Sequence, residues 1–167
     1  DLNLNFVIIR RLVKRTGVVP FVQLFFKMLA SKSIPENCKL YIAGDGPEKQ
    51  KLITLINDSN FKENVHYIGL INDEEKIELF KKADYNIVPT LKLEGFGLVI
   101  IEAGICGCMS IVSNVGGMPE VIGYLSNQGI VYNLPEADCI KAFEDIEKNQ
   151  YDKKALHQLT KKVFYFE

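Results

Sequence analysis

The sequence predicts an α/β fold in which a six-stranded parallel sheet is doubly wound, with helices on both faces. Short apolar stretches alternate along the whole chain with longer segments whose apolar residues recur at helical spacing. This alternation favours parallel strands, because a crossover helix returns the chain to the same end of the sheet. The chain has 167 residues, of which 47% are apolar, so it can bury one core but is too short for two ordinary domains.

Six segments have the apolar composition expected of strands in such a sheet. They are Asn5–Ile9, Lys39–Ala43, Val65–Ile68, Tyr85–Val88, Ser110–Ser113 and Ile130–Tyr132. Gly69 ends the third segment and Pro89 ends the fourth, since both residue types interrupt regular strands. In a doubly wound sheet ligands bind beyond the carboxyl ends of the strands, so functional residues are expected in the loops that follow them.

Helices are expected between these strands and after the last one. The expected segments are Val18–Ala30, Pro47–Asn57, Asp73–Lys82, Gly97–Cys106, Pro135–Glu147 and Asp152–Phe164, with at most a helical turn at Pro119–Ile122. Pro47 suits a first turn, and Asn72 suits an N-cap. The resulting order of strands and helices predicts a Rossmann-like layout.

The charge balance does not indicate a bulk electrostatic attraction to either of two classes of partner. The chain has 20 basic and 21 acidic residues and a net charge of −1, so nothing attracts it to nucleic acid or to an anionic membrane. No apolar run reaches the roughly 18 residues of a membrane span, and no basic segment opens a signal peptide. The chain starts in a strand-like stretch without an initiator Met, and we expect it to be part of a longer protein.

The cysteines and histidines do not indicate a metal site. Cys38, Cys106, Cys108 and Cys139 lack the spacing of a disulfide framework or of a zinc site. Reduced thiols in a cytosolic protein are therefore expected. His66 lies between apolar neighbours, which favours packing over ligation.

The most informative stretch is Glu-Gly-Phe-Gly-Leu-Val-Ile-Ile-Glu-Ala, from Glu94 to Ala103, between the fourth strand and the next helix. Its two glycines allow close backbone approach and the helix N-terminus presents free N–H groups, which together suit a phosphate. Glu102 leans back toward the edge that carries Glu94, where ribose and sugar hydroxyls would satisfy both carboxylates. The alternative is that Glu102 pairs with a nearby Lys or Arg while Glu94 is simply exposed before a turn.

This stretch closely resembles the E-x7-E motif of retaining glycosyltransferases of family four, which have the two-domain GT-B fold. Further blocks match the same family in order. They are Tyr41–Pro47 with its Gly-Asp-Gly-Pro turn, Val65–Gly69, Ala83–Thr90, Cys106–Gly107 and Gly116–Ile122. The resemblance implies that residues 1–167 form the C-terminal, nucleotide-sugar-binding domain of such an enzyme, one half of a GT-B fold, and that the N-terminal acceptor domain is absent.

The resemblance also implies roles for individual residues. Glu102 would bind the ribose of the nucleotide, Glu94 would bind hydroxyls of the transferred sugar, and Lys76 would reach the nucleotide. Arg11 would clamp the diphosphate, so Glu94 and Arg11 are the implied catalytic residues. Main-chain contacts are implied for a larger set, which comprises Gly95, Phe96, Gly97 and Leu98 at the sugar and diphosphate and Leu70 and Ile71 at the base.

The loop after the first strand, Arg10–Gly17, departs from the family pattern of Gly-Arg-Leu followed by Lys-Gly. Arg10 replaces the glycine, and Thr16 stands where a second cation is expected. Each lost phosphate contact would cost about 1.5–3 kcal/mol. Lys14, which we include among the donor-binding residues, or Arg15 would compensate from the same loop. The alternative is that this segment is a solvated basic turn.

The implied activity is transfer of a sugar from a nucleoside-diphosphate sugar to an acceptor hydroxyl with retained anomeric configuration, without a metal or another cofactor. Polysaccharide, capsule or lipopolysaccharide biosynthesis is the expected pathway, in the cytoplasm, with the full-length protein peripheral to a membrane. The expected partners are the donor and, through the absent domain, an acceptor sugar or lipid-linked glycan. This chain alone is expected to bind the donor and to turn over little or nothing.

Several alternatives remain open from the sequence. The domain could be a degenerate GT-B homologue that binds nucleotide without catalysis, with Thr16 as the first sign of that loss. It could also be another GT-B enzyme, such as a phosphorylase or a sugar-nucleotide epimerase. A redox Rossmann enzyme is disfavoured, because the chain has no Gly-x-Gly-x-x-Gly fingerprint.

Overall fold

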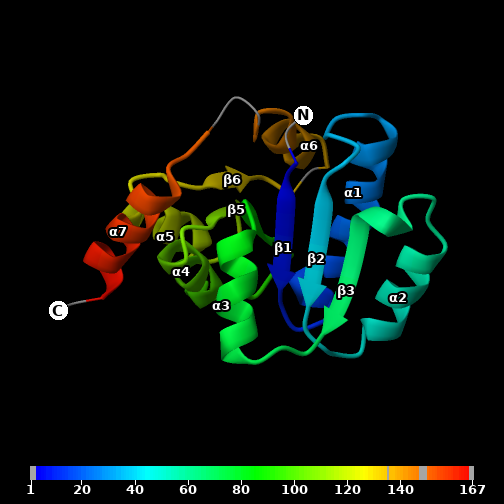
Figure 1. Cartoon of the computed structure of the whole chain (residues 1–167), viewed down its shortest axis with the longest axis horizontal. Coiled ribbons are helices and arrows are strands. Elements are labelled where there is room, and N and C mark those ends of the chain that lie inside the picture. The colour runs from blue at the N-terminus through cyan, green and yellow to red at the C-terminus, as the bar shows by residue number, and fades with distance from the viewer. Residues whose placement is uncertain (1–2, 135, 147–149, 166–167) are drawn as a thin grey trace.

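The predicted doubly wound parallel sheet is confirmed in the computed structural model, which describes residues 3–134, 136–146 and 150–165. Within these residues the sheet has six strands in the spatial order β3-β2-β1-β4-β5-β6 (Figure 1). The strands are β1 (Asn5–Ile9), β2 (Lys39–Ala43), β3 (Val65–Gly69), β4 (Tyr85–Val88), β5 (Met109–Ser113) and β6 (Ile130–Tyr132). The order reverses between β1 and β4, and a crevice is expected beyond the carboxyl ends of these two strands.

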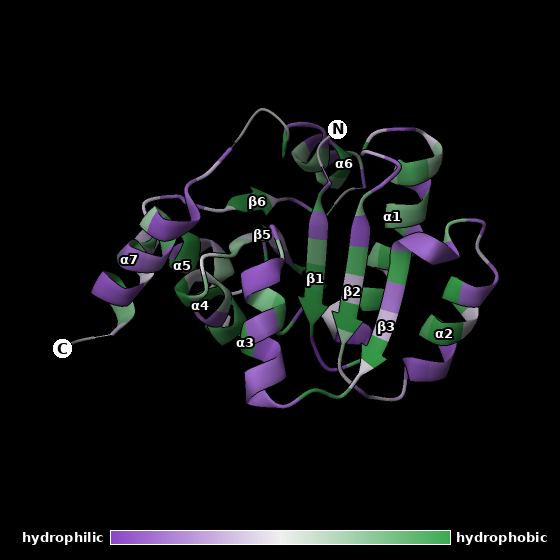
Figure 2. Cartoon of the chain, viewed as in Figure 1, coloured by the Kyte–Doolittle hydropathy of each residue, from purple (hydrophilic) through white to green (hydrophobic). Residues whose placement is uncertain are grey.

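Helices cover both halves of the sheet. They are α1 (Val18–Ala30), α2 (Lys49–Asn57), α3 (Asp73–Lys82), α4 (Leu98–Ile105), α5 (Met118–Tyr124), α6 (Glu136–Glu144) and α7 (Lys153–Phe164), with short 3₁₀ helices η1 (Lys14–Thr16) and η2 (Lys62–Asn64). Figure 1 shows α1 and α2 beside β2 and β3, and α4, α5 and α7 together on the other side of the molecule. The strands are mainly hydrophobic at their carboxyl halves, whereas α3 is largely hydrophilic (Figure 2).

Two helices differ from their prediction. The segment expected to form at most a turn at Pro119–Ile122 is the helix α5, because Met118 and Val121 are buried and tertiary packing stabilises it beyond its weak sequence signal. The helix expected from Pro47 begins only at Lys49, after Glu48 has donated its N–H to the carbonyl of Leu12 at 2.9 Å.

Other boundaries agree with the sequence to within a residue or two. Asn72 caps α3 as predicted, and it forms a capping box with Glu75. Asp152 caps α7 by accepting two backbone N–H groups. The predicted ends of α6, Pro135 and Glu147, lie outside the described residues.

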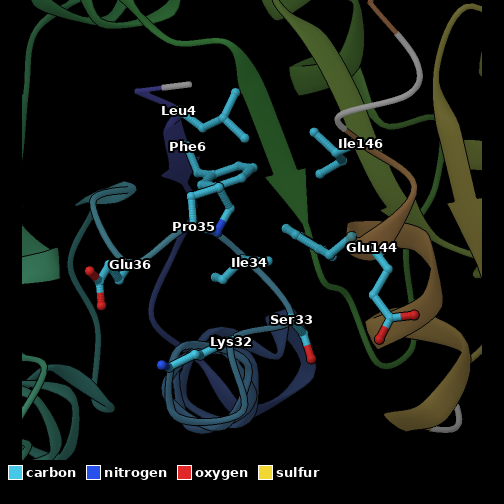
Figure 3. A pocket seen from close by; sticks show the side chains of 10 residues that line it. Leu4, Phe6, Lys32, Ser33, Ile34, Pro35, Glu36, Glu144 and Ile146 are labelled. Atoms are coloured by element: carbon cyan, nitrogen blue, oxygen red, sulfur yellow. The ribbon is translucent and has the colours of Figure 1, made fainter. Parts of the chain in front are cut away.

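The amino end of β1 opens into a cavity of about 360 Å³ (Figure 3). Leu4, Phe6 and Ile34 form its apolar floor, while Lys32 and Glu144 lie at its rim. The cavity lies at the end of the strand that is opposite to the predicted ligand edge, and none of the predicted site residues lines it.

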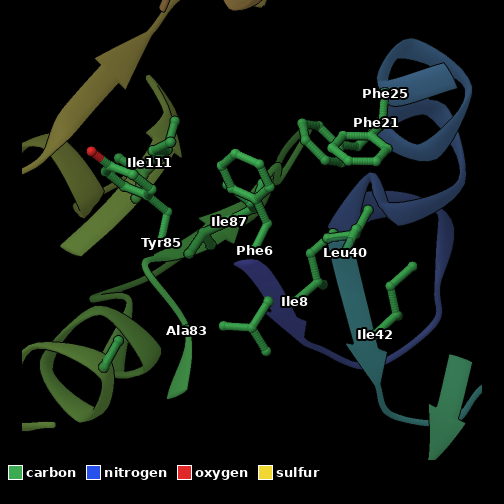
Figure 4. Packing of buried hydrophobic residues seen from close by; sticks show 14 of the residues in the cluster. Phe6, Ile8, Phe21, Phe25, Leu40, Ile42, Ala83, Tyr85, Ile87 and Ile111 are labelled. Carbon is green, nitrogen blue, oxygen red and sulfur yellow. The ribbon is translucent and has the colours of Figure 1, made fainter. Parts of the chain in front are cut away.

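The core below this cavity is built around Phe6. The centroid of its ring lies 6.0 Å from that of Phe25 in α1, 5.9 Å from that of Tyr85 in β4 and 5.5 Å from that of Phe143 in α6 (Figure 4). Aromatic pairs at these distances stabilise a fold by about 0.5–1.5 kcal/mol beyond the burial of their area. One side chain of β1 therefore joins helices and strands that are far apart in the sequence.

Backbone hydrogen bonds join the loops at the carboxyl edge of the sheet. Arg10 donates its N–H to the carbonyl of Ala43 at 3.1 Å, Leu12 to Asp45 at 2.9 Å and Gly44 to Gly69 at 2.9 Å. An added Cβ on Gly44, whose φ is +141°, would lie 1.8 Å from the carbonyl oxygen of Arg10. The Gly-Asp-Gly turn is therefore needed for close contact between the loops after β1 and β2.

Replacing Gly17 with Ala should destabilise the fold by at least about 2 kcal/mol. Gly17 has a φ of +70°, and its new Cβ would lie 2.0 Å from the carbonyl oxygen of Pro89 in the loop after β4. Gly123→Ala is the control, because nothing lies within 4 Å of the added carbon and Ala is favoured in the helix α5. Urea unfolding followed by circular dichroism compares the two variants. Equal free energies of unfolding would contradict the close approach of the β1 and β4 loops.

Candidate functional site

Two adjoining cavities lie at the carboxyl edge of the sheet. We call the first the Arg11 cavity; it has a volume of about 500 Å³ and is lined by Ile9, Arg10, Arg11, Gly44, Asp45, Gly46, Leu70 and Ile71. We call the second the glutamate cavity; it has a volume of about 440 Å³ and is lined by Ile9, Arg10, Lys76, Glu94, Phe96, Gly97, Leu98, Val99 and Glu102. Ile9 and Arg10 line both cavities, so the two open on either side of the carboxyl end of β1.

The two glutamates of the motif share one cavity, as the sequence predicts. Glu94 is held in the loop after β4, and Glu102 lies in α4. The prediction that Glu102 leans toward Glu94 is therefore confirmed, because a helical side chain points back toward the N-terminus of its helix.

Glu94 is not the exposed residue of the alternative interpretation. Its side chain is only 12% exposed and forms an ion pair with Arg10 through Oε2 and Nη2. Thr90 joins the pair, since its hydroxyl accepts from Arg10 Nη2 at 3.1 Å and donates to the same carboxylate oxygen at 3.0 Å. The interaction bridges the point where the strand order reverses, because Arg10 follows β1 while Thr90 and Glu94 follow β4.

Glu102 does pair with a lysine, as the alternative interpretation expects. Lys76 of α3 places its Nζ 2.9 Å from Glu102 and 3.6 Å from Asp73. The hydrogen bond to Glu102 raises the pKa of Lys76 above its ordinary value. The Glu102 side chain remains 41% exposed, so it can still receive a hydroxyl donor from a ligand in the glutamate cavity.

The backbone between the two glutamates is shaped for anion binding. Gly97 precedes α4 with a φ of +74°, and the first N–H groups of the helix that follow it have no intrahelical acceptor. A second loop supports this turn, because Gly117 donates its N–H to the carbonyl of Gly95 at 2.9 Å. An added Cβ on Gly116 would lie 1.8 Å from the carbonyl oxygen of Glu94, so the Gly-Gly motif is explained by this contact.

The residues of the basic loop after β1 differ in whether they line a cavity. Arg11 is exposed and lines the Arg11 cavity, as predicted for a diphosphate clamp. Lys14 is exposed and lines neither cavity. Arg15 donates from Nη1 to the carbonyl of Leu93 at 3.2 Å, also outside both cavities. Thr16 is buried, and its hydroxyl lies 2.7 Å from the carbonyls of Arg11 and Val13, so it fixes the loop.

Most of the remaining predicted contacts lie in two groups, whereas Gly95 lines neither cavity. Leu70 and Ile71 line the Arg11 cavity, with Leu70 75% exposed, so their main-chain groups border the space predicted for a base. Phe96 and Leu98 line the glutamate cavity. The ring of Phe96 packs edge-on against Phe164 of α7, with centroids 6.2 Å apart.

The contacts of Thr90 with Arg10 and Glu94 were not predicted from the sequence. Arg10 was predicted only to depart from the Gly-Arg-Leu pattern of the family. Both residues lie directly beyond a strand, Arg10 after β1 and Thr90 two residues after β4. Polar residues just after two strands could have predicted this contact from the sequence, because the loops after neighbouring strands meet where the strand order reverses.

Neither a metal cluster nor a membrane span is found in the part of the chain that the structure describes. No group of three or more His, Cys, Asp or Glu side chains is placed to hold an ion there. No helix there is both long enough and apolar enough to cross a bilayer. Cys38, Cys106, Cys108 and Cys139 are all free thiols, as predicted.

Comparisons with known proteins agree with this geometry. The sequence model of the family described as "Glycosyl transferases group 1" matches residues 3–163. N-acetyl-alpha-D-glucosaminyl L-malate synthase of Bacillus anthracis is 36% identical over 124 residues, covering 71% of this chain and 30% of that protein. O-antigen chain mannosyltransferase B of Escherichia coli is 37% identical over 78 residues, covering 47% of this chain and 19% of that protein.

Solved structures have the same fold. The lipopolysaccharide outer core galactosyltransferase WaaB in its apo form superposes with a TM-score of 0.79 at 18% identity, covering 99% of this chain and 46% of that one. The pneumococcal O-GlcNAc transferase GtfA in complex with UDP and GlcNAc superposes with a TM-score of 0.77 at 16% identity, covering 96% and 32%. The chain thus spans less than half the length of each of these relatives.

Replacing Glu102 with Gln should lower the pKa of Lys76 toward its ordinary value of 10.5, because the hydrogen bond to Glu102 is the main cause of the rise. A folded-state pKa above the unfolded value means that the pair stabilises the fold below pH of about 10.5 and loses this effect as the pH rises through the folded-state pKa. NMR titration of the Lys76 side chain measures the shift. Asp73→Asn, at the more distant carboxylate, should change it less. An unaltered Lys76 titration in Glu102→Gln would rule the pair out.

Proposed function

This chain belongs to the group 1 glycosyl transferases, and from that premise we propose that it is the donor-binding domain of a retaining glycosyltransferase. The single observation that carries the proposal is the shared cavity of Glu94 and Glu102, which adjoins the cavity of Arg11. A nucleoside-diphosphate sugar has three kinds of group for these surroundings: an aromatic base with polar edges, an anionic diphosphate and two sets of sugar hydroxyls.

The donor is proposed to lie across both cavities. Leu70 and Ile71 would border the base, and Glu102 would accept from the ribose hydroxyls. The diphosphate would lie between Arg11 and the first N–H groups of α4, where a guanidinium and helix dipole both favour negative charge. Glu94 would accept from hydroxyls of the transferred sugar.

The proposed chemistry depends on stabilising the leaving group. The bond from the anomeric carbon to the diphosphate breaks with its electron pair on the diphosphate, the oxygen of an acceptor hydroxyl forms the new bond with retained configuration, and the hydroxyl proton passes to the departing diphosphate. The departing diphosphate gains negative charge, which Arg11 and the α4 N–H groups would stabilise without reorganising. We propose that these groups act without a metal ion.

The acceptor is proposed to bind to a second domain. Closure of that domain over the cavities would exclude water, which competes with the acceptor for the donor. The isolated chain would then bind nucleotide and transfer little or nothing. The similarity to O-antigen chain mannosyltransferase B supports a place in surface-polysaccharide assembly, and the free cysteines suit the reducing cytoplasm. Membrane attachment of a longer protein would then lie outside this chain.

A binding-only domain is the second candidate. Arg10 pairs with the carboxylate that would otherwise receive the sugar, and Thr16 supplies no charge. Calorimetric titration of the intact protein with uridine, guanosine and adenosine diphosphates, followed by transfer assays with labelled donors, separates the two candidates. Nucleotide binding followed by transfer supports the enzyme, binding without transfer to any acceptor supports the second candidate, and no binding refutes both.

Arg11→Ala should weaken the binding of a nucleoside diphosphate by roughly tenfold or more and leave the binding of the nucleoside unchanged. The lost interaction is a guanidinium–phosphate contact, which only the diphosphate can make. Lys51→Ala, which removes an exposed cation from α2, is the control. Calorimetry with both ligands measures the difference. If Arg11→Ala weakened the two ligands equally, the assignment of Arg11 to the diphosphate would be wrong.

The two glutamates should differ in what their loss affects. Glu102→Gln should weaken the bare nucleoside diphosphate and the nucleotide sugar alike, because its partner is the ribose. Glu94→Gln should weaken the nucleotide sugar several-fold more than the bare nucleotide, because its partner is the sugar. Competition binding with both ligands measures the ratio. Small and equal effects of the two substitutions would remove both residues from the site.

A further inference from the structure

Arg10 forms the partition between the two cavities. Arg10 and Ile9 are the two residues that line both of them among the described residues, and Arg10 is the charged one. The carboxyl end of β1 fixes its backbone, since Arg10 donates its N–H to the carbonyl of Ala43 at 3.1 Å. Its guanidinium is held by Thr90 and by Glu94, which lines the glutamate cavity.

The guanidinium is anchored along one edge only. Nη2 is held by Glu94 and by the hydroxyl of Thr90 at 3.1 Å, and the side chain is 13% exposed. Nε is buried without a hydrogen-bond partner in the described residues. Nη1 has no partner among the described residues either, but it is not buried, so it can donate to a ligand.

Few of the cations at the two cavities are free to bind a diphosphate. Glu102 is already paired with Lys76, and Glu94 with Arg10. Among the described residues, Arg11 is then the remaining cation that lines either cavity, because Lys14 and Arg15 lie outside both. The carboxylate of Asp45 lines the Arg11 cavity too, where it accepts the N–H of Gly46 at 2.9 Å, and its negative charge adds to the need for a second cation. The Thr16 hydroxyl is taken by backbone carbonyls. A diphosphate with about two negative charges would therefore meet one free guanidinium and the amides of α4.

We propose that Arg10 is a second phosphate-binding arginine: anchored through Nη2 on Glu94 and Thr90, it donates from Nη1 to the donor diphosphate on the side opposite Arg11. This inference rests on the proposed function. A guanidinium is suited to the task because its fork of N–H groups can hold an anchor and a ligand at the same time. Glu94 and Thr90 are then positioning residues for Arg10, in addition to any contact of Glu94 with the sugar.

The contacts of Arg10 with Glu94 and Thr90 lower the free-energy cost of using Arg10 to bind phosphate. The guanidinium is already largely desolvated and fixed in orientation by its two partners, so little conformational entropy is lost when the phosphate arrives. The ion pair also holds the Glu94 carboxylate neutralised, which removes a repulsion that an unpaired acid would exert on the diphosphate. Arg10 thus affects the diphosphate in two ways, by direct donation and by screening Glu94, and the two can be separated by mutation.

The test uses the nucleoside diphosphate selected by calorimetry from the uridine, guanosine and adenosine compounds, with its nucleoside as the second probe. Arg10→Gln should weaken the diphosphate roughly tenfold or more and leave the nucleoside within about twofold, which also reports that the variant is folded. Arg10→Lys should weaken the diphosphate less, because the charge is kept. Arg15→Gln, which removes a guanidinium bound to the Leu93 carbonyl outside both cavities, is the matched control and should have little effect.

The double variant Arg10→Gln/Glu94→Gln separates direct contact from screening. If Arg10 contacts the phosphate, the double variant should regain only the part of the affinity that the unpaired Glu94 costs, and it should still bind the diphosphate several-fold more weakly than the wild type. If the double variant recovers wild-type affinity, Arg10 acts only by neutralising Glu94 and the proposal is wrong. Tighter or unchanged binding in Arg10→Gln, with Arg11→Ala still weak, would also overturn it while leaving the proposed function intact. Failure of the wild-type protein to bind any of the diphosphates would refute both.

Discussion

The ion pair between Arg10 and Glu94 depends on the reversal of strand order in this sheet. β1 and β4 are neighbours in space although the 75 residues from 10 to 84 lie between Ile9, the end of β1, and Tyr85, the start of β4, and the loops that follow them meet beyond their carboxyl ends. Thr90 lies between the two charges and bonds to both. Every candidate contact to a donor is arranged around this bridge, because the Arg11 cavity lies on one side of Arg10 and the glutamate cavity on the other.

The glycines in the turns at this edge of the sheet bring its loops together through close backbone contacts. Gly17, Gly44 and Gly116 each lie so close to a neighbouring carbonyl oxygen that a Cβ would come within about 2 Å of it. They let the loops after β1, β2, β4 and β5 pack backbone against backbone. Such packing leaves side chains at the surface of the cavities free for ligands, and it holds the loops in place by hydrogen bonds that do not depend on the ligand.

The sequence predicted the sheet well because its signals are local. Alternating apolar segments, strand-ending glycine and proline residues, and the Asn72 cap each depend on neighbours within a few residues. The shared cavity of Glu94 and Glu102 was also predictable, since both lie on one continuous turn and helix. Two kinds of feature were not predictable. α5 is stabilised by tertiary burial of Met118 and Val121, and the partner of Glu94 is supplied by a residue 84 positions away.

Arg10 stands where the family pattern has a glycine, and its contacts explain how an arginine at this position is compatible with the proposed donor site. Arg10 lines both cavities after β1, and its guanidinium pairs with the carboxylate of Glu94, which we propose as the sugar contact. Nη2 holds the carboxylate and the Thr90 hydroxyl, and Nη1, which has no hydrogen-bond partner among the described residues, is the donor that we propose for the diphosphate. The planar guanidinium has donors on two edges, so it can bind the Glu94 carboxylate and a diphosphate at the same time. The ammonium of a lysine is a single compact charge and would have to bind both anions at one point. An arginine therefore suits this position between β1 and β4 better than a lysine of the same charge.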